Sequence, residues 1–156
     1  GLEQALDGVF RPDEGIVDRP IGPHPSQAGK MAVRRRGKSA RTAYRCVETF
    51  RQFALLELHL HTGRTHQARI HLAHLGHPLA VDPLYGKRAA FFLSEVKGRR
   101  YRLGKNREER PLLRRHPLHA YRLAFTHPLS GQPQHFEAPL PKDFSAILRQ
   151  LRKWGK

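Results

Sequence analysis

Residues 60–72 have the sequence Leu60-His61-Thr62-Gly63-Arg64-Thr65-His66-Gln67-Ala68-Arg69-Ile70-His71-Leu72. This order predicts the end of a strand, a glycine turn and the start of a helix in succession. Arg64 lies at the junction, where a helix N-terminus adds unsatisfied N–H groups and partial positive charge. A guanidinium held there can pair with a carboxylate or a phosphate through two hydrogen bonds. The spacing leaves a second role open, in which Arg64 caps a neighbouring carbonyl or pairs with a surface acid.

Regular hydrophobic patterns extend from this junction in both directions. Upstream, β-branched, aromatic and aliphatic residues cluster over 42–50 and 53–61 with two polar residues between them, which predicts an antiparallel hairpin. Leucines alternate with polar residues in the second of these strands, so one face is expected to be buried by Leu56, Leu58 and Leu60. Downstream, a helix is expected to be capped by Thr65 and ended by Gly76, with apolar residues at helical spacing: Ala68, Leu72 and Leu75.

The remainder of the chain is predicted to hold one more hairpin and one more helix. The hairpin comprises 118–125 and 134–138, and an amphipathic helix spans about 142–154 with a buried stripe of Phe144, Ile147, Leu148 and Leu151. Residues 97–116 are polar and basic, and we expect them to form a long exposed loop. Residues 1–29 hold five Gly and four Pro, and we interpret them as turns and extended pieces through which the chain enters the domain.

The chain is long enough for one domain, and its charge favours a polyanionic partner. Its 156 residues include 29 Lys or Arg against 13 Asp or Glu, a formal net charge of +16, so RNA, DNA and anionic membranes are the candidate partners. No apolar run approaches the roughly 18 residues of a spanning helix, which excludes a transmembrane segment. Cys46 is the only cysteine, which rules out an internal disulfide and a cysteine-rich zinc site and fits a cytoplasmic protein. Because the first residues contain neither an initiator Met nor a signal peptide, we expect a processed or truncated start.

Further motifs follow the junction in a specific order. Residues 75–78 are Leu-Gly-His-Pro, and residues 82–86 are Asp-Pro-Leu-Tyr-Gly. Together with residues 60–72 they closely resemble the large-subunit ribosomal RNA pseudouridine synthase family of the RluA and RluD type. Flanking landmarks of that family follow in the expected order, so the resemblance covers almost the whole chain; they lie at 15–22, 38–42, 118–120 and 125–128.

The resemblance implies both a fold and an activity. The fold is α+β, a largely antiparallel mixed sheet with flanking helices on one side, which the predicted order of hairpins and helices permits. The activity is isomerisation of uridine to pseudouridine in ribosomal or transfer RNA, without a cofactor or metal. The glycosidic bond breaks, the uracil turns, and a carbon–carbon bond forms to the ribose. The target base leaves its stack to enter a pocket, in which Ala68 stands where the family usually has a larger aliphatic side chain.

A family motif is absent from the chain. In the family, an aspartate in a His-Arg-Leu-Asp sequence begins the chemistry, and none of the 13 acids here lies in such a sequence. Arg64 corresponds to the family's catalytic-site arginine that pairs with this aspartate. We therefore interpret residues 1–156 as the C-terminal part of a catalytic domain whose N-terminal half is missing, which would leave sheet edge or apolar surface exposed. The alternative is a relative that kept RNA binding and lost catalysis.

Basic side chains supply candidate RNA contacts. The candidates are Arg34, Arg35, Arg36, Lys38 and Arg41, with His66 and Arg69 from the junction. His66 also admits a purely structural hydrogen-bonding role. A second run, residues 97–115, holds nine Lys or Arg against Glu108 and Glu109. Such runs are often only solvated faces, but at this net charge we expect at least one to contact phosphate. A non-enzymatic RNA-binding module and, less favoured, a basic ribosome-associated protein remain alternative functions.

Eleven histidines raise the question of a metal site, but their spacing argues against one. On the predicted helix only the pairs His71/His74 and His74/His77 are three residues apart, and no carboxylate accompanies them. A catalytic zinc site needs three convergent ligands and an open position. We expect no metal site, and we expect most of these histidines to be surface residues or structural hydrogen-bonding partners.

Overall fold

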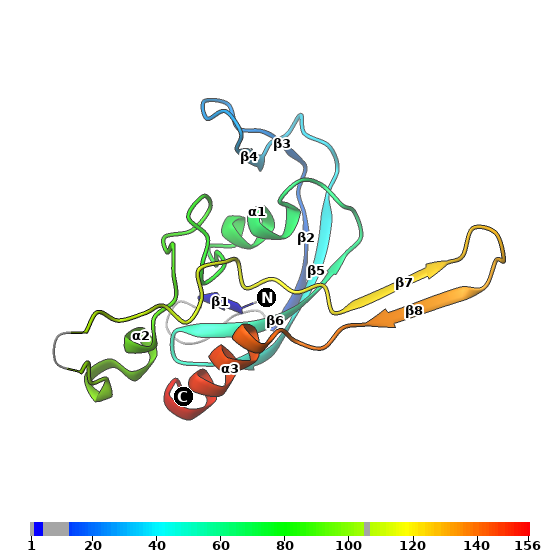
Figure 1. The fold of residues 1–156 in the computed structure, drawn as a ribbon. Helices are drawn as coiled ribbons and strands as arrows, with labels where there is room; N and C mark the ends of the chain where they lie inside the picture. Colours follow the sequence, from blue (N-terminus) through cyan, green and yellow to red (C-terminus); the bar gives the residue numbers. More distant parts are fainter. Residues whose placement is uncertain (1, 5–12, 105–106) are drawn as a thin grey trace.

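The computed structural model describes residues 2–4, 13–104 and 107–156, and its central element is a four-stranded antiparallel sheet (Figure 1). The strands lie in the order β1 (Leu2–Gln4), β6 (Phe53–Leu60), β5 (Arg41–Thr49) and β2 (Glu14–Asp18). β5 and β6 form the predicted first hairpin, with a β-bulge between Cys46 and Glu48. The α+β class and this hairpin are therefore confirmed.

Two smaller sheets and three α-helices complete the fold of the described ranges. The sheets pair β3 (Ile21–Pro23) with β4 (Met31–Val33), and β7 (Arg122–Thr126) with β8 (Pro133–Glu137). The helices are α1 (Gln67–His74), α2 (Leu93–Lys97), which leads into a 3₁₀ turn (Gly98–Arg100), and α3 (Lys142–Trp154). The second hairpin is confirmed, with a shorter first strand than predicted and a second strand that begins and ends one residue earlier. The final helix is confirmed with the predicted bounds.

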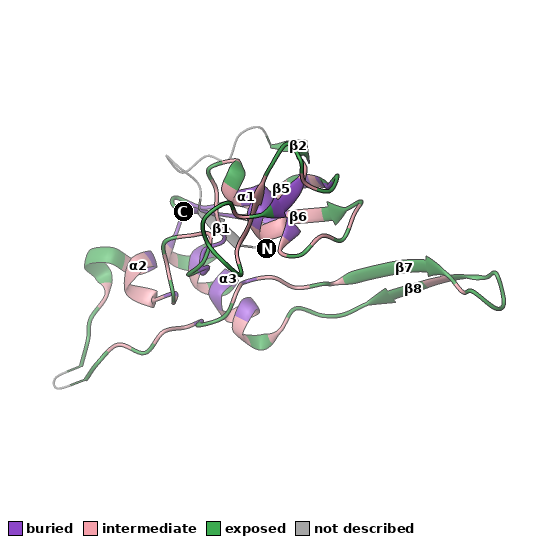
Figure 2. Cartoon of the chain, turned by 90° about the horizontal axis from the view of Figure 1, so that it is seen from above, coloured by how far each residue is buried: buried purple, intermediate pink, exposed green. Residues whose placement is uncertain are grey.

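β6 is buried on both faces where it begins. Ala54 and Leu56 pack in one cluster with Leu72 of α1, whereas Phe53 packs in another with Phe144 of α3. Alternate side chains of a strand point to opposite faces of its sheet, so the two helices cover opposite faces. The prediction that helices flank the sheet on one side is therefore wrong, because four consecutive apolar residues at the start of β6 need cover on each face. Figure 2 shows buried residues along β5, β6 and α3.

The apolar stripe of α3 is buried as predicted. Phe144 is 2% exposed and Ile147, Leu148 and Leu151 are each 1% exposed. Their spacing of three and four residues places them on one face of the helix. Full burial of a side chain of this size contributes about 1.5–3 kcal/mol, so the stripe is a main source of packing energy on this face of the sheet.

Two segments predicted to be irregular contribute regular structure. Residues 1–29 include β2 and β3. All five residues of β2 pair with β5, and β3 pairs with β4. The predicted loop 97–116 begins at the end of α2 and returns to the core, where Leu113 is 4% exposed and pairs with Phe91. In both places a partner distant in sequence supplies the hydrogen bonds, which local composition does not show. Residues 1, 5–12 and 105–106 of these two segments lie outside the described residues.

The β7–β8 hairpin projects away from the rest of the molecule (Figure 1). Its apolar side chains are exposed, and the rings of Phe125 and Phe136 stack with centroids 6.0 Å apart. Leu60, at the end of β6, is also exposed, so the predicted row of buried leucines does not reach it. The domain thus presents apolar surface along this hairpin and at the end of β6.

Candidate functional site

The connection from β6 to α1 is held in place by the buried amide of Gln67. Its Oε1 accepts hydrogen bonds from the Thr62 hydroxyl at 2.7 Å and from the Arg64 backbone N–H at 3.0 Å. Its Nε2 donates to the Arg41 carbonyl at 2.9 Å and to the Thr42 hydroxyl oxygen at 3.0 Å. A side-chain amide has two acceptor and two donor positions, and all four are used here. Gln67 therefore fixes the connection to the beginning of β5.

The helix begins differently from the prediction. His66, rather than Thr65, is the residue before α1, and its backbone is left-handed with φ 56° and ψ 23°. No side chain caps the helix N-terminus, so the predicted Thr65 cap is wrong: the chain turns at His66, and Gln67 bonds back from inside the first turn. Positive φ is uncommon for a residue other than glycine and persists where surrounding contacts impose it. The predicted end is confirmed, because Gly76 follows the helix with φ 86°.

A chain of buried hydrogen bonds continues from Gln67 to the backbone of Arg19. Thr42 Oγ1 lies 2.8 Å from His71 Nδ1, and His71 Nε2 lies 2.9 Å from the Arg19 carbonyl. The carbonyl can only accept, so we assign the imidazole proton to Nε2, and the Thr42 hydroxyl donates to Nδ1. Burial lowers the pKa of His71 and outweighs the hydrogen bond to Arg19, which acts in the opposite direction. His71 is therefore a neutral structural link.

Arg64 is half-buried at this junction, and one nitrogen of its guanidinium is anchored. Nε donates to the Ser39 carbonyl at 2.8 Å. Among the described residues, the two terminal nitrogens have no hydrogen-bond partner and no carboxylate pairs with the side chain. The carbonyl contact that the sequence left open is thus present, and it leaves the terminal nitrogens available for a second partner.

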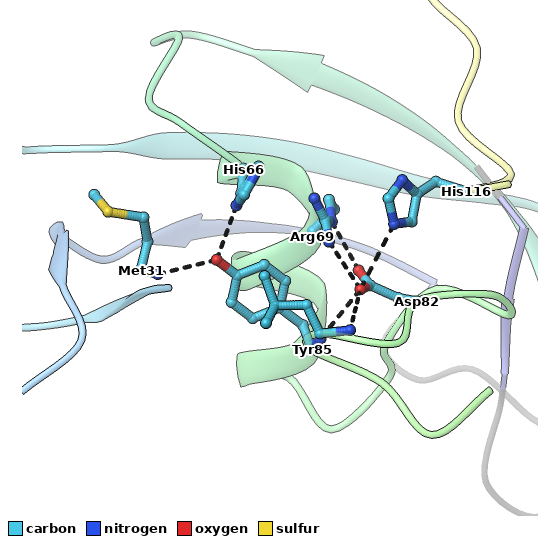
Figure 3. A network of polar contacts seen from close by, with 7 residues as sticks. Met31, His66, Arg69, Asp82, Tyr85 and His116 are labelled. Carbon is cyan, nitrogen blue, oxygen red and sulfur yellow. Dashed lines mark hydrogen bonds and ion pairs between the residues drawn. The ribbon is translucent and has the colours of Figure 1, made fainter. Parts of the chain in front are cut away.

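His66 and Tyr85 connect α1 to β4 (Figure 3). The Tyr85 hydroxyl accepts a hydrogen bond from the Met31 N–H at 3.0 Å and lies 2.9 Å from His66 Nδ1. Burial lowers the pKa of His66, and the neighbouring Arg69 charge lowers it further. The imidazole is then neutral, and Nδ1 accepts a hydrogen bond from the Tyr85 hydroxyl. His66 therefore has the structural hydrogen-bonding role that the sequence left open.

Asp82 holds the turn that carries Tyr85. Its carboxylate is 0% exposed and receives Arg69 Nε at 2.8 Å and Arg69 Nη2 at 2.9 Å. The backbone N–H groups of Leu84 and Tyr85 each donate to it at 3.1 Å, and His116 Nε2 lies 3.8 Å away (Figure 3). Burial acts to raise the pKa of Asp82, but Arg69 and the backbone donors outweigh it and the pKa is lowered. The Arg69 guanidinium, predicted to contact RNA, is therefore committed to an internal ion pair.

The basic run predicted to bind RNA is exposed and lies beside Arg64. Within this run, Gly37 approaches the backbone of Ile21 so closely that an added Cβ would lie 2.4 Å from its carbonyl carbon. Only glycine permits this turn, which follows β4 and leads into β5. The Ser39 carbonyl that accepts from Arg64 belongs to the same segment. The exposed basic residues of the segment are Arg34, Arg35, Arg36, Lys38 and Arg41.

The structure therefore gathers part of the predicted site. Arg64 and the basic run meet at the junction, and Ala68 is half-buried in the first turn of α1. The sequence did not single out Gln67 or Thr42, and it placed His71 only among possible structural histidines. Helical spacing could have identified Gln67 and His71. Residues 67, 70 and 71 are three and four positions apart, so they share the buried face of α1.

The histidines are dispersed through the described parts of the chain. His59 and His61 place their rings 4.5 Å apart, whereas His66 and His71 are engaged in hydrogen bonds. Among the described residues, no three His, Cys, Asp or Glu side chains gather so that they could hold a metal ion. Over the same residues, no helix combines the length and apolar character needed to cross a membrane.

Comparison with known proteins places the junction in a family. The family model described as RNA pseudouridylate synthase matches residues 8–74, a range that includes Arg64, Gln67 and His71. A Chloroflexus aurantiacus protein named "Uncharacterized RNA pseudouridine synthase" is 43% identical over 151 residues, and "Ribosomal large subunit pseudouridine synthase D" of Nitrosomonas europaea is 45% identical over 139 residues. The chain belongs to the RNA pseudouridine synthase family.

The pseudouridine synthases that match are longer than this chain. The two alignments cover 97% and 89% of the chain but 42% and 37% of the respective relatives. The solved structure titled "Human RNA Pseudouridylate Synthase Domain Containing 4" superposes with a TM-score of 0.61 at 24% identity, over 97% of this chain and 61% of that one. This likeness supports the fold. The resemblance to the RluA and RluD type of synthase is thereby confirmed.

Proposed function

We propose that the chain forms the C-terminal part of the catalytic domain of an RNA pseudouridine synthase that isomerises uridine in ribosomal or transfer RNA in the cytoplasm. In this proposal the chain supplies the junction around Arg64, and a segment with the His-Arg-Leu-Asp sequence supplies the aspartate. The reaction needs neither cofactor nor metal. The names of the relatives, which include large-subunit ribosomal synthases, support RNA as the substrate.

The proposal rests on how the Arg64 guanidinium is held and on which of its nitrogens remain available. Its Nε is anchored on the Ser39 carbonyl, and its backbone N–H is anchored on Gln67. The two terminal nitrogens have no partner among the described residues. An arginine that is already restricted loses less conformational entropy when it pairs with a carboxylate. This arrangement suits an arginine that receives the aspartate from another segment.

Arg64 acts in this proposal as a positioning residue for the aspartate. A guanidinium beside a carboxylate favours the ionised form, so the aspartate stays charged at neutral pH and keeps one orientation towards the flipped uridine. The aspartate then begins the exchange in which the glycosidic bond breaks, the uracil turns, and its carbon bonds to the ribose. Ala68 borders the base pocket in this scheme, where its small side chain leaves more room than the larger aliphatic residue usual in the family.

The exposed basic run supplies the electrostatic part of RNA binding. Arg34, Arg35, Arg36, Lys38 and Arg41 lie in the segment that also holds Ser39, so phosphates bound there would flank the site at Arg64. Contacts of this kind position the RNA without reading its sequence. In this proposal His66 and Arg69 support the interface through their contacts with Tyr85 and Asp82 and do not themselves bind phosphate.

The test is single-turnover pseudouridine formation by the longer natural protein, compared with the isolated chain. The isolated chain is expected to make no pseudouridine. In the longer protein, Arg64→Lys keeps the charge but loses the planar fork and is expected to be badly impaired. The acid limb of the pH–rate profile of Arg64→Lys should move to higher pH, because an aspartate that is less well paired has a higher pKa. A purely structural arginine would not move that limb.

The matched control is Arg45→Lys, because Arg45 lies away from the junction. Its side chain is 61% exposed, and its guanidinium pairs with the Glu57 carboxylate at 3.1 Å. We expect the wild-type rate and pH profile for this variant. Thermal melting and RNA titration separate loss of folding or affinity from loss of rate. A folded Arg64→Lys enzyme with the wild-type profile would remove the assigned role. RNA binding without pseudouridine formation by the longer wild-type protein would favour the non-catalytic relative instead.

A further inference from the structure

A second basic region lies at the end of the molecule away from β3 and β4, where α2, the 3₁₀ turn and the end of α3 meet the β5–β6 turn (Figure 1). These elements line a cavity of about 400 Å³ that opens to solvent. Its lining combines buried apolar side chains with cationic ones and a single indole. The apolar residues are Phe53, Val96 and Leu151, and the cationic residues are Arg51, Lys97, Arg99 and Arg100.

Three positive charges surround the indole of Trp154. Lys97 Nζ lies 4.6 Å from the ring centroid, Lys153 Nζ lies 5.1 Å from it, and Arg100 Cζ lies 5.9 Å from it. Each charge is attracted to the ring, but the three repel one another. An anionic group placed among them would relieve this repulsion.

The one carboxylate in the lining is already engaged. Glu95 accepts hydrogen bonds from Arg88 Nε at 2.6 Å and from the Phe92 N–H at 2.9 Å. The cavity is also braced, because Arg51 donates from its guanidinium to the Trp154 carbonyl at 3.1 Å and from its backbone to the Gly155 carbonyl at 2.6 Å. The cavity is therefore preformed and carries a net positive charge.

We infer that this cavity binds a short single-stranded segment of RNA, with phosphates held by the cationic side chains and one base against Trp154. Single-stranded RNA has a regular row of negative charges, which would pair with the cationic side chains, and flat aromatic bases, which would contact the indole. An acidic peptide would supply the charge without the faces. The inference rests on the proposed function for its choice of RNA, and it adds a contact for a flanking part of the substrate, far from Arg64.

Trp154 is the only tryptophan of the chain, so its fluorescence reports on this cavity directly. Titration of the chain with an unstructured uridine hexamer is expected to quench this fluorescence saturably. Lys97→Gln with Arg100→Gln should weaken the quenching by roughly tenfold, because two phosphate contacts are lost. Lys142→Gln with Arg149→Gln removes the same charge from exposed positions outside the cavity and should leave the quenching midpoint within about twofold of wild type.

Anisotropy of a labelled hexamer measures total RNA binding in parallel, and thermal melting checks that the variants fold. Binding by anisotropy without Trp154 quenching would overturn this site while leaving the RNA binding of the proposed function intact. Equal weakening by both double variants would show a general charge effect and also overturn it. Quenching by a glutamate hexamer at the same midpoint would overturn the choice of RNA as the ligand.

Discussion

The Arg69 guanidinium and the Asp82 carboxylate form a bidentate ion pair, with N–O distances of 2.8 and 2.9 Å, at a point where Asp82 is 0% exposed. The pair joins α1 to the turn that carries Tyr85. Tyr85 in turn contacts His66 and β4. A structural pair thus anchors the helix that begins at the junction presenting Arg64.

Replacement of Asp82 by Asn should destabilise the chain strongly. It leaves the guanidinium of Arg69, 12% exposed, without a countercharge, and loss of one partner of a buried pair costs about 3–5 kcal/mol. The control is Asp143→Asn, because Asp143 forms a bidentate pair with Arg115 at 2.7 and 2.8 Å but both side chains are about 40% exposed. Exposed pairs contribute about 0–1 kcal/mol. Urea denaturation measures both variants, and equal losses would contradict the burial argument.

Gln67→Leu should loosen the connection that carries Arg64. The substitution removes four hydrogen bonds and leaves the buried Thr42 hydroxyl without its donor, so we expect a loss of about 2–3 kcal/mol in the free energy of unfolding. Gln132→Leu, at an exposed position in the β7–β8 turn, should change it by less than about 0.5 kcal/mol. Thermal melting compares the two variants. A Gln67→Leu chain as stable as wild type would show that the amide network is dispensable.

Stability should fall as pH drops below the ordinary histidine pKa of about 6.5. The pKa values of His71 and His66 are lowered in the folded state, so the unfolded chain binds protons there at a pH where the folded chain does not. Each group then contributes a slope of up to about 1.4 kcal/mol per pH unit, and the slope vanishes above neutral pH. His71→Asn should reduce the slope between pH 7 and pH 5, whereas His135→Asn on the exposed face of β8 should keep it. Urea midpoints across this range are the measurement, and an unchanged slope in His71→Asn would refute the assignment.

The triple variant Arg34→Ala, Arg35→Ala, Arg36→Ala should weaken RNA binding for all sequences alike. Each phosphate contact contributes about −0.7 to −0.9 to the slope of log affinity against log salt, so the slope should become shallower by about 2 to 3. A charge-matched control replaces three exposed basic residues outside both basic runs, Lys87, Lys142 and Arg149, by Ala. Equal effects of the two triples would mean that net charge, and not this run, governs binding.

Local pattern was enough to predict the elements whose apolar residues follow one clear period. The α3 stripe from Phe144 to Leu151 and the β5–β6 hairpin are the examples. It was misleading where burial is two-sided. The alternation of Leu56, Leu58 and Leu60 suggested one buried face, whereas the consecutive apolar residues just before it meet a helix on each face.

The candidate site, like the fold, could be predicted only in part from the sequence. The position of Arg64 at a strand–turn–helix junction follows from the order of residues, but its Ser39 contact depends on a segment 25 residues upstream. Likewise, the Arg69–Asp82 pair and the His71 link join residues that are distant in sequence, and no local period encodes them. Polar partners of this kind depend on how the elements pack, so basic residues that look equivalent in the sequence, such as Arg69 and Arg36, have different environments in the fold.

The burial of β6 on both faces affects how the domain unfolds. Phe53 belongs to the cluster under α3, while Ala54 and Leu56 belong to the cluster under α1, so the two clusters share one strand. Neither cluster can open fully without detaching β6, which also pulls the other one open. The two clusters therefore unfold as one cooperative unit with β6 at its centre, while the projecting β7–β8 hairpin can fray without disturbing that unit.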